Sequence, residues 1–163
     1  MILYHGTNTD IDVIDISLGH RYKDFGRGFY LTPSRDTAIR MARKKANLFG
    51  GKAYLIEYEF DDVNAAKSNL NLKSFSEKAT PEWFLFVESN RDRNLEHPVH
   101  NYDIVVGPIA DDGVVLQITN YRGGYISVEQ AANLLQDKYL DLRYYFGTQI
   151  SLTYLHKISA TAL

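Results

Sequence analysis

Two short segments near the N-terminus carry side chains suited to chemistry. Residues 4–7 (Tyr-His-Gly-Thr) set the His5 imidazole beside a glycine, whose backbone a ligand can approach closely. Residues 26–30 (Gly-Arg-Gly-Phe-Tyr) set Arg27 between two glycines ahead of Tyr30, which is typical of a loop that approaches a phosphate. Each segment also has a structural interpretation: a strand-end histidine bonded to a carbonyl group, and a hairpin turn leading into core aromatic residues.

Other kinds of site find little support. The chain has no cysteine, which excludes disulfides, thiolate metal sites and a cysteine nucleophile. Its histidines show no paired metal-ligand spacing, and Pro98 separates His97 from His100 so that the two do not share a helical face. We therefore expect no bound metal. The G-x-S-x-G, P-loop and H-E-x-x-H motifs are also missing.

The overall composition is that of an ordinary globular protein. The chain has 163 residues, 45% of them hydrophobic and 23% charged, which indicates a single domain over residues 1–163. A net charge of -2 provides no strong overall field toward nucleic acid or membrane. No apolar stretch approaches the length of a membrane span, and no secretory leader is visible, so we expect a cytoplasmic protein with no membrane partner.

Local patterns predict the elements that must position these side chains. Ser34 and Gly50 bound a helix, Thr80 and Pro81 begin a second, and a Ser127-x-x-Gln130 capping box begins a third that runs to about residue 136. Strands are expected at residues 2–7, 29–32, 53–60, 102–109 and 144–146, with a short strand or extended piece at 114–119. The type of residues 10–18, 61–79 and 151–158 stays open. Because strands and helices do not alternate steadily, the fold class is α+β.

Taken together, the motifs are more informative than each one alone. Residues 5–7, residues 26–32 and the helix containing Ala38 resemble the first two signature motifs of ADP-ribosyltransferases of the diphtheria-toxin and poly(ADP-ribose) polymerase type, a class named for a His, Tyr, Glu trio. The rest resembles one small bacterial branch of that superfamily, a domain family of unknown function often found beside a small toxin-antitoxin partner. The segments that carry this likeness are residues 24–32, 83–91, 101–111, 144–148 and 152–155.

The resemblance implies an ADP-ribosyltransferase-like split, mostly antiparallel two-sheet core with flanking helices and an NAD⁺ cleft between the sheets. In that cleft His5 bonds a ribose, the Gly6 backbone pairs with the nicotinamide amide, and Tyr30 stacks on the nicotinamide ring. It also implies further cleft residues: Thr7, Arg27, Phe29, and Met41, whose sulfur packs on the ring.

The third strand departs from the family pattern. The resemblance aligns Arg143 with the position of the family's Glu or Gln, and a permanent cation there disfavours an oxocarbenium-like sugar. If the strand is regular, Asp141 shares its face about 7 Å away, whereas Gln149 lies about 20 Å away. Asp141 is therefore the preferred substitute, and Arg143 is a second possibility that grips the NAD⁺ pyrophosphate or an acceptor phosphate.

Three functions stay open at this stage. The leading one is an NAD⁺-dependent mono-ADP-ribosyltransferase, a toxin-like effector that modifies a protein or nucleic-acid acceptor and has a small antitoxin partner. The second keeps the fold but acts as an NAD⁺ glycohydrolase or an RNA 2′-phosphotransferase-like enzyme, and Arg21, Arg27 and Arg143 motivate it. The third is a catalytically degenerate module that only binds NAD⁺ or a partner.

Overall fold

The computed structural model describes residues 1–136 and 140–163. Its strands are β1 (Ile2–Thr7), β2 (Phe29–Leu31), β3 (Tyr54–Phe60), β4 (Leu72–Ser74), β5 (Ile104–Pro108), β6 (Leu142–Phe146) and β7 (Leu155–Ala162). The helices in these residues are α1 (Arg35–Phe49), α2 (Asp62–Lys67), α3 (Pro81–Asn90), α4 (Asp112–Arg122), α5 (Val128–Leu135) and α6 (Gln149–Leu152). A turn of 3-10 helix spans Ile16–Leu18.

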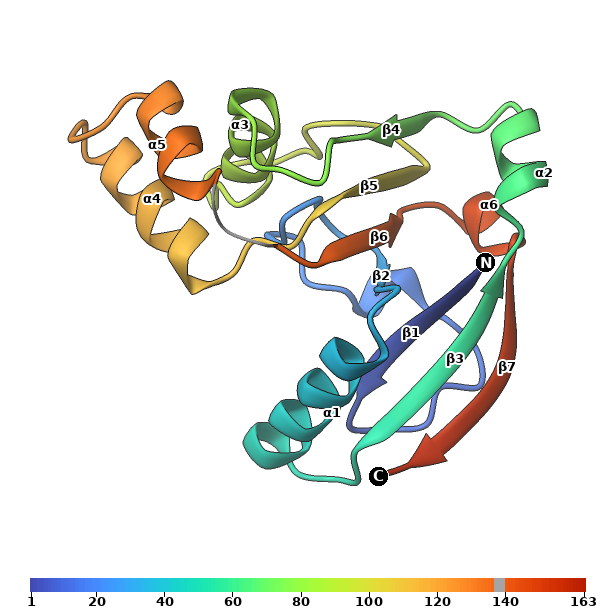
Figure 1. The fold of residues 1–163 in the computed structure, drawn as a ribbon. Coiled ribbons are helices and arrows are strands. Elements are labelled where there is room, and N and C mark those ends of the chain that lie inside the picture. The colour runs from blue at the N-terminus through green and yellow to red at the C-terminus, as the bar shows by residue number, and fades with distance from the viewer. Residues whose placement is uncertain (137–139) are drawn as a thin grey trace.

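The strands form two separate sheets, one of order β1-β3-β7 and one of order β2-β6-β5-β4. Every pairing is antiparallel except that of β4 with β5. Figure 1 shows the two sheets diverging from the region of β2, with α1 beside the three-stranded sheet and α3, α4 and α5 gathered at one end of the other. The predicted α+β class with two mostly antiparallel sheets is thereby confirmed.

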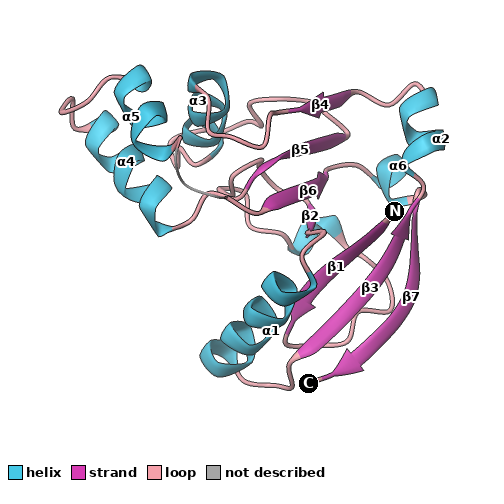
Figure 2. Ribbon diagram, in the orientation of Figure 1, coloured by secondary structure: helices cyan, strands magenta, loops and turns pink. Residues whose placement is uncertain are grey.

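Among the residues that the structure describes, one isolated backbone bridge joins the sheets at the point where they diverge. Tyr4 of β1 and Thr32, directly after β2, exchange two hydrogen bonds of 2.8 and 2.9 Å. Beyond that bridge the strands separate, as the colouring by secondary structure also shows (Figure 2). The bridge therefore marks the point from which β1 and β2 diverge.

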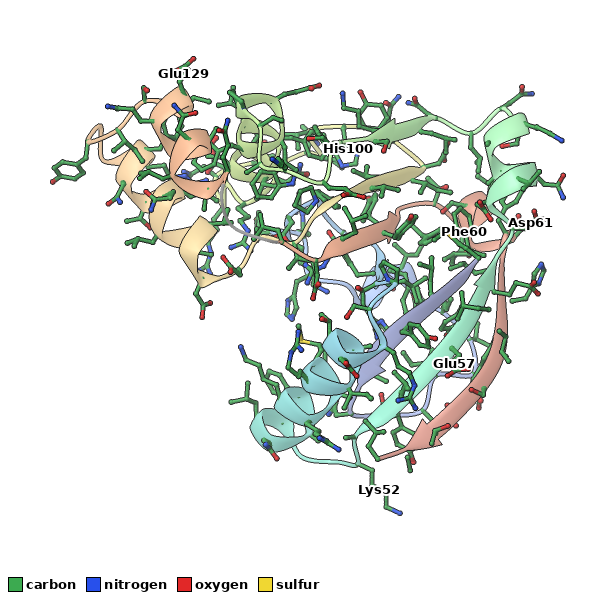
Figure 3. All side chains as sticks on the ribbon, viewed as in Figure 1. Lys52, Glu57, Phe60, Asp61, His100 and Glu129 are labelled. Atoms are coloured by element: carbon green, nitrogen blue, oxygen red, sulfur yellow. The ribbon has the colours of Figure 1, made fainter. Side chains whose placement is uncertain are left out.

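Two hydrophobic clusters hold the fold together. One lies between the inner faces of the two sheets and includes Leu3, Ile56 and Phe146, with Phe60 set edge-on against Phe146 at a centroid distance of 5.1 Å. Figure 3 places Phe60 where the sheets approach each other. The other cluster packs α3, α4 and α5 against the four-stranded sheet around the fully buried Trp83. Each sheet thus has a core that keeps its cleft-facing edge in place.

Helix α1 forms as its sequence predicts and packs closely on β1. The Ser34 hydroxyl accepts the Thr37 N–H, Asp36 lies in the first turn, and Gly50 ends the helix with a φ of 76°. A Cβ on Gly6 would lie 1.9 Å from the Ala38 carbonyl oxygen, so only glycine permits this approach. The glycine in the first motif therefore has a packing role whatever else it does.

The sequence-based expectation fails most clearly at residues 114–119. They lie in helix α4 rather than in a strand, because the Asp111 carboxylate accepts the N–H groups of Gly113 and Val114 and caps a helix there. Two elements in the weakly patterned residues 61–79, α2 and β4, were not predicted. Gln149 begins α6, so the strand that carries Arg143 ends before Gln149 and the two residues share no strand face.

Candidate functional site

A cleft of about 680 Å³ opens between β1 and β2, where the two sheets separate. Its walls come from both strands, from α1, from residues 9–15 and from the start of β6. The predicted site residues that line it are His5, Gly6, Phe29, Tyr30, Met41 and Arg143. The fold therefore brings the two N-terminal motifs and the third-strand position to one concave surface.

His5 is held as a neutral imidazole. Its Nδ1 lies 2.7 Å from the Tyr30 carbonyl oxygen, and because a carbonyl only accepts, Nδ1 carries the proton. Burial and the nearby Lys45 lower the pKa of His5 to about 3. Nε2 has no hydrogen-bond partner among the described residues and is not fully buried, so it stays an acceptor for a ligand hydroxyl. The Phe29 ring stacks on the imidazole at 4.5 Å and fixes its plane.

The ring of Tyr30 lines the cleft, whereas its hydroxyl is hydrogen-bonded to the protein backbone. The hydroxyl donates to the Gly26 carbonyl oxygen at 2.5 Å and accepts the Phe25 N–H at 3.2 Å. Burial raises the pKa of Tyr30 well above its usual value. The Lys23 ammonium and the Arg143 guanidinium lie 5.0 and 5.3 Å from the ring centroid. The ring is thus a cation-binding surface, and the hydroxyl is not available as an acid or base.

Gly6 directs its backbone polar groups to the cleft side of β1. Tyr4 uses its N–H and C=O to bond Thr32, on the edge away from β3, and Gly6, two residues on, faces the same edge. The Gly6 carbonyl oxygen accepts from the Lys45 ammonium at 2.8 Å. A ligand that uses this carbonyl therefore meets Lys45 as well.

Three cations, Lys23, Lys45 and Arg143, form what we name the cationic cluster. Burial and the charges of Lys23 and Arg143 lower the pKa of Lys45 to about 8. Burial and the charge of Arg143 likewise lower the pKa of Lys23. An anionic ligand in the cleft relieves this mutual repulsion, so the cluster favours phosphate groups.

Arg143 is held by a buried carboxylate. Asp24, 1% exposed, receives two bonds from the Arg91 guanidinium, at 2.8 and 2.5 Å, and one from Arg143 at 2.9 Å. It also accepts the Ala110 N–H at 3.2 Å. This network fixes Arg143 at the third-strand position and leaves Asp24 committed to ion pairs.

Asp141 lies at the rim of the cleft rather than in its wall. It precedes β6, is half-buried, accepts a short hydrogen bond from the Thr37 hydroxyl and lies 3.6 Å from the Arg40 guanidinium. Thr37 lines the cleft, so one side chain separates the carboxylate from its interior. We expected Asp141 to share a strand face with Arg143, but β6 begins at Leu142, so Asp141 lies one residue outside the strand.

Two predicted residues lie elsewhere. Thr7 is buried, and its hydroxyl accepts the Thr9 N–H at 3.4 Å without lining the cleft. Arg27 is exposed and lines a second cavity, because the loop from Asp24 to Gly28 presents its residues to opposite sides. The structure therefore does not place either residue in the walls of the cleft.

Sequence reasoning missed Lys23, Lys45 and Asp24. Lys45 follows Ala38, Met41 and Ala42 at helical spacing, and that spacing was a usable signal. No signal in the sequence shows that Asp24 contacts Arg143, because 119 residues separate them.

Residues 1–136 and 140–163 hold no group of three His, Asp or Glu side chains placed for a metal ion. In that part of the chain no helix has both the length and the apolar character needed to cross a bilayer. The family model described as Protein of unknown function (DUF3990) matches residues 1–157. No curated protein and no solved structure matches the chain.

Proposed function

Because this chain belongs to the DUF3990 family, whose description assigns no activity, we propose its function from the cleft itself: the protein binds NAD⁺ and transfers ADP-ribose to a macromolecular acceptor. The observation that carries the proposal is the meeting of His5, Gly6 and Tyr30 on one groove of about 680 Å³. That volume suits a dinucleotide-sized ligand, which ordinary ligand pockets of several hundred Å³ enclose.

The chemistry of the walls matches the parts of NAD⁺. The Tyr30 ring already attracts cations, so the nicotinamide ring, a planar cation, stacks there in place of the Lys23 ammonium. The Lys23 ammonium has no ion-pair partner among the described residues, which makes it the group that moves. The Gly6 backbone pairs with the carboxamide, and Met41 packs on the ring from α1.

The ribose and the phosphates follow from the same arrangement. His5 Nε2, held as an acceptor, receives a hydrogen bond from a ribose hydroxyl. The cationic cluster faces the two negative charges of the pyrophosphate. In transfer, the bond between C1′ and the nicotinamide nitrogen breaks, and its electron pair leaves with neutral nicotinamide. The acceptor N–H or O–H group then bonds to C1′ and releases its proton.

Asp141 is the carboxylate that the proposal assigns to the developing positive charge on the ribose. Its carboxylate accepts a hydrogen bond from Thr37, which lines the cleft, whereas Asp24 is committed to two arginines. Positioning of NAD⁺ and electrostatic stabilisation of this charge are the two contributions the reaction requires. A toxin-like role in the cytoplasm and a small antitoxin partner rest on the sequence resemblance alone.

One observation favours a second candidate. The cationic cluster places more positive charge near Tyr30 than an oxocarbenium-like sugar favours. The same cations suit an RNA 2′-phosphate that is passed to NAD⁺, so an RNA 2′-phosphotransferase-like activity is the alternative.

The test is incubation of the protein with NAD⁺ labelled in the adenylate phosphate, with and without cell lysate, followed by separation of nicotinamide and labelled macromolecules. We expect label on an acceptor with the wild type, and at least a 100-fold loss with Tyr30→Ala. Tyr125→Ala is the matched control, because Tyr125 is 83% exposed and lines neither cavity.

The other outcomes separate the alternatives. Nicotinamide release without any acceptor identifies a glycohydrolase. Turnover only with 2′-phosphorylated RNA identifies the phosphotransferase. Saturable NAD⁺ binding with no nicotinamide release over hours identifies a binding module and overturns the proposal of transfer.

A further inference from the structure

A second cavity of about 480 Å³ adjoins the cleft and has no role in the function proposed above. Residues 25–27 line it, whereas Asp24 and Gly28 line the cleft, so a single loop is the wall between the two. Tyr22 lines both, which makes it their common rim. Ligands in the two cavities can therefore both contact Tyr22.

The inner wall of this cavity is aromatic and firmly positioned. Tyr145 lies against the Cα atoms of Gly28 and Gly147, where any Cβ would come within 2.2 Å of its side chain. Its hydroxyl donates to the Arg27 carbonyl oxygen at 3.0 Å. The His100 ring lies 5.7 Å from Tyr145 and 5.3 Å from Tyr102. The wall thus presents π surfaces that cannot easily rearrange.

His100 contributes a ring face and no charge. Its Nδ1 accepts the Tyr102 N–H at 3.1 Å, and its Nε2 donates to the Phe25 carbonyl oxygen at 2.8 Å. Both nitrogens are therefore occupied in the neutral form. Figure 3 shows His100 beside the four-stranded sheet.

One polar atom at this cavity lacks a partner. Asn90 is 4% exposed and lines the cavity; its Nδ2 donates to the Phe86 carbonyl oxygen at 2.8 Å. Its Oδ1 has no hydrogen-bond partner among the described residues, and the atom is not fully buried. An acceptor in a nearly buried side chain at a cavity is a place for a ligand N–H group.

The charged residues at the mouth have one sign. Arg21 and Arg27 line the cavity, and no described residue of its lining is acidic. Arg21 also lies over the Tyr22 ring at 5.9 Å. The cavity thus combines aromatic faces, one acceptor on a nearly buried side chain and two guanidinium groups.

We propose that this cavity binds a nucleobase of a single-stranded nucleic acid, which makes nucleic acid the acceptor; the proposal rests on the transfer activity proposed above. The base packs against Tyr102 and Tyr145, its N–H edge donates to Asn90 Oδ1, and the flanking phosphates bond Arg21 and Arg27. At the Tyr22 rim, an N–H or O–H group of the bound nucleotide attacks C1′ of the nicotinamide ribose. Nicotinamide leaves with the bonding electron pair, and the acceptor proton passes to water.

The test measures binding of fluorescent single-stranded RNA and DNA of about 12 nucleotides by anisotropy, without NAD⁺. We expect saturable binding that weakens with salt. Tyr102→Ala should lower the oligonucleotide affinity by about 10-fold, whereas Tyr102→Phe, which keeps the ring, should bind as the wild type does. Arg27→Gln should weaken binding several-fold. It should also reduce by about one the slope of the logarithm of the binding constant against the logarithm of the salt concentration. Lys52→Gln is the matched control, since Figure 3 shows Lys52 in the turn that leads from α1 into β3, and it lines neither cavity.

Each remaining outcome is decisive. If the protein binds NAD⁺ in a parallel titration but binds no oligonucleotide, or if Tyr102→Ala and Arg27→Gln bind as the wild type does, the nucleobase site is overturned and the proposed function stands. Oligonucleotide binding without NAD⁺ binding supports the nucleobase site and overturns the proposed function. If AMP competes at concentrations equal to those of the oligonucleotide, the occupant of the cavity is a free nucleotide, and the proposal of a single-stranded nucleic acid is overturned. Label found on protein in nuclease-treated lysate overturns nucleic acid as the acceptor.

Discussion

The Nδ1 atom of His5 lies 2.7 Å from the backbone carbonyl oxygen of Tyr30. This hydrogen bond joins β1 of one sheet to β2 of the other, next to the bridge between Tyr4 and Thr32. It therefore holds the two motif residues on the same groove and at the same time assigns the imidazole proton to Nδ1. The structural interpretation of His5 as a histidine bonded to a carbonyl is correct, and it leaves Nε2 for a ligand.

The first prediction concerns the stability of the protein between pH 3 and 6.5. The pKa of His5 is lowered to about 3, and an unfolded histidine titrates near 6.5, so in this range the unfolded chain binds a proton that the folded chain does not. The contribution of His5 is fully present above pH 6.5 and declines as the pH falls, with a slope of up to about 1.4 kcal/mol per pH unit. Denaturant unfolding at a series of pH values measures it.

His5→Asn should remove about one proton from the difference in proton binding between the unfolded and folded chains, and so lower the slope of the free energy of unfolding against pH. The exposed His20 is the control, and His20→Asn should leave the slope unchanged. Equal slopes for the wild type and His5→Asn would show that the imidazole is not held neutral.

The second prediction separates the two parts of Tyr30. Tyr30→Phe removes the hydroxyl and leaves the buried Phe25 N–H without its acceptor, so the free energy of unfolding should fall by about 1–2 kcal/mol. The ring remains, and NAD⁺ affinity should stay within about 3-fold of the wild type because stacking requires only the π face. Chemical denaturation and calorimetry measure the two quantities. A stable Tyr30→Phe variant that loses NAD⁺ binding would contradict the assignment of the hydroxyl to the protein.

The sequence predicts those parts of the fold that local residues determine. Helix α1 is recognisable because Ser34 caps it and Gly50 ends it, and β3 because its residues alternate between core and solvent. Helix α4 was missed because its apolar residues 114–118 contain three β-branched side chains, while the single cap at Asp111 decides the structure.

The candidate site is predictable only in part. His5, Gly6 and Tyr30 could be found because each lies in a short motif. The position of Arg143 depends on its ion pair with Asp24, which Arg91 also contacts. Asp24 and Arg91 are 67 residues apart in the chain, so only the tertiary fold brings them together. The second cavity likewise combines residues from α3, β6 and three loops that no local pattern connects.

The third prediction concerns the pH dependence of NAD⁺ binding. The pKa of Lys45 is lowered to about 8, and a bound pyrophosphate raises it again by favouring the ammonium form. Binding is therefore strongest below pH 8, and the Kd should rise by up to about 10-fold per pH unit above it. Calorimetric titrations from pH 7 to 9.5 measure this.

Lys45→Met should weaken binding and abolish the pH dependence above 8. Lys44→Met is the matched control, because Lys44 is exposed and lines neither cavity. A Kd that rises equally in Lys45→Met and the wild type would assign the titration to another group.

The fourth prediction distinguishes the two acids near the third strand. Asp24→Asn leaves two arginines without their buried counter-charge, so stability should fall by about 3 kcal/mol. Asp141→Asn affects a half-buried rim residue, and the variant should remain folded while transfer falls roughly 100-fold. Thermal unfolding together with the labelling assay measures both changes. Full transfer activity in Asp141→Asn would remove Asp141 from the reaction.

The most direct measurement of the central claim is a calorimetric titration of the folded protein with NAD⁺. We predict saturable binding at one site per chain, lost in Tyr30→Ala and retained in Tyr125→Ala. Saturation that is unchanged in a folded Tyr30→Ala variant, or no saturable binding by the folded wild type at millimolar NAD⁺, would contradict it.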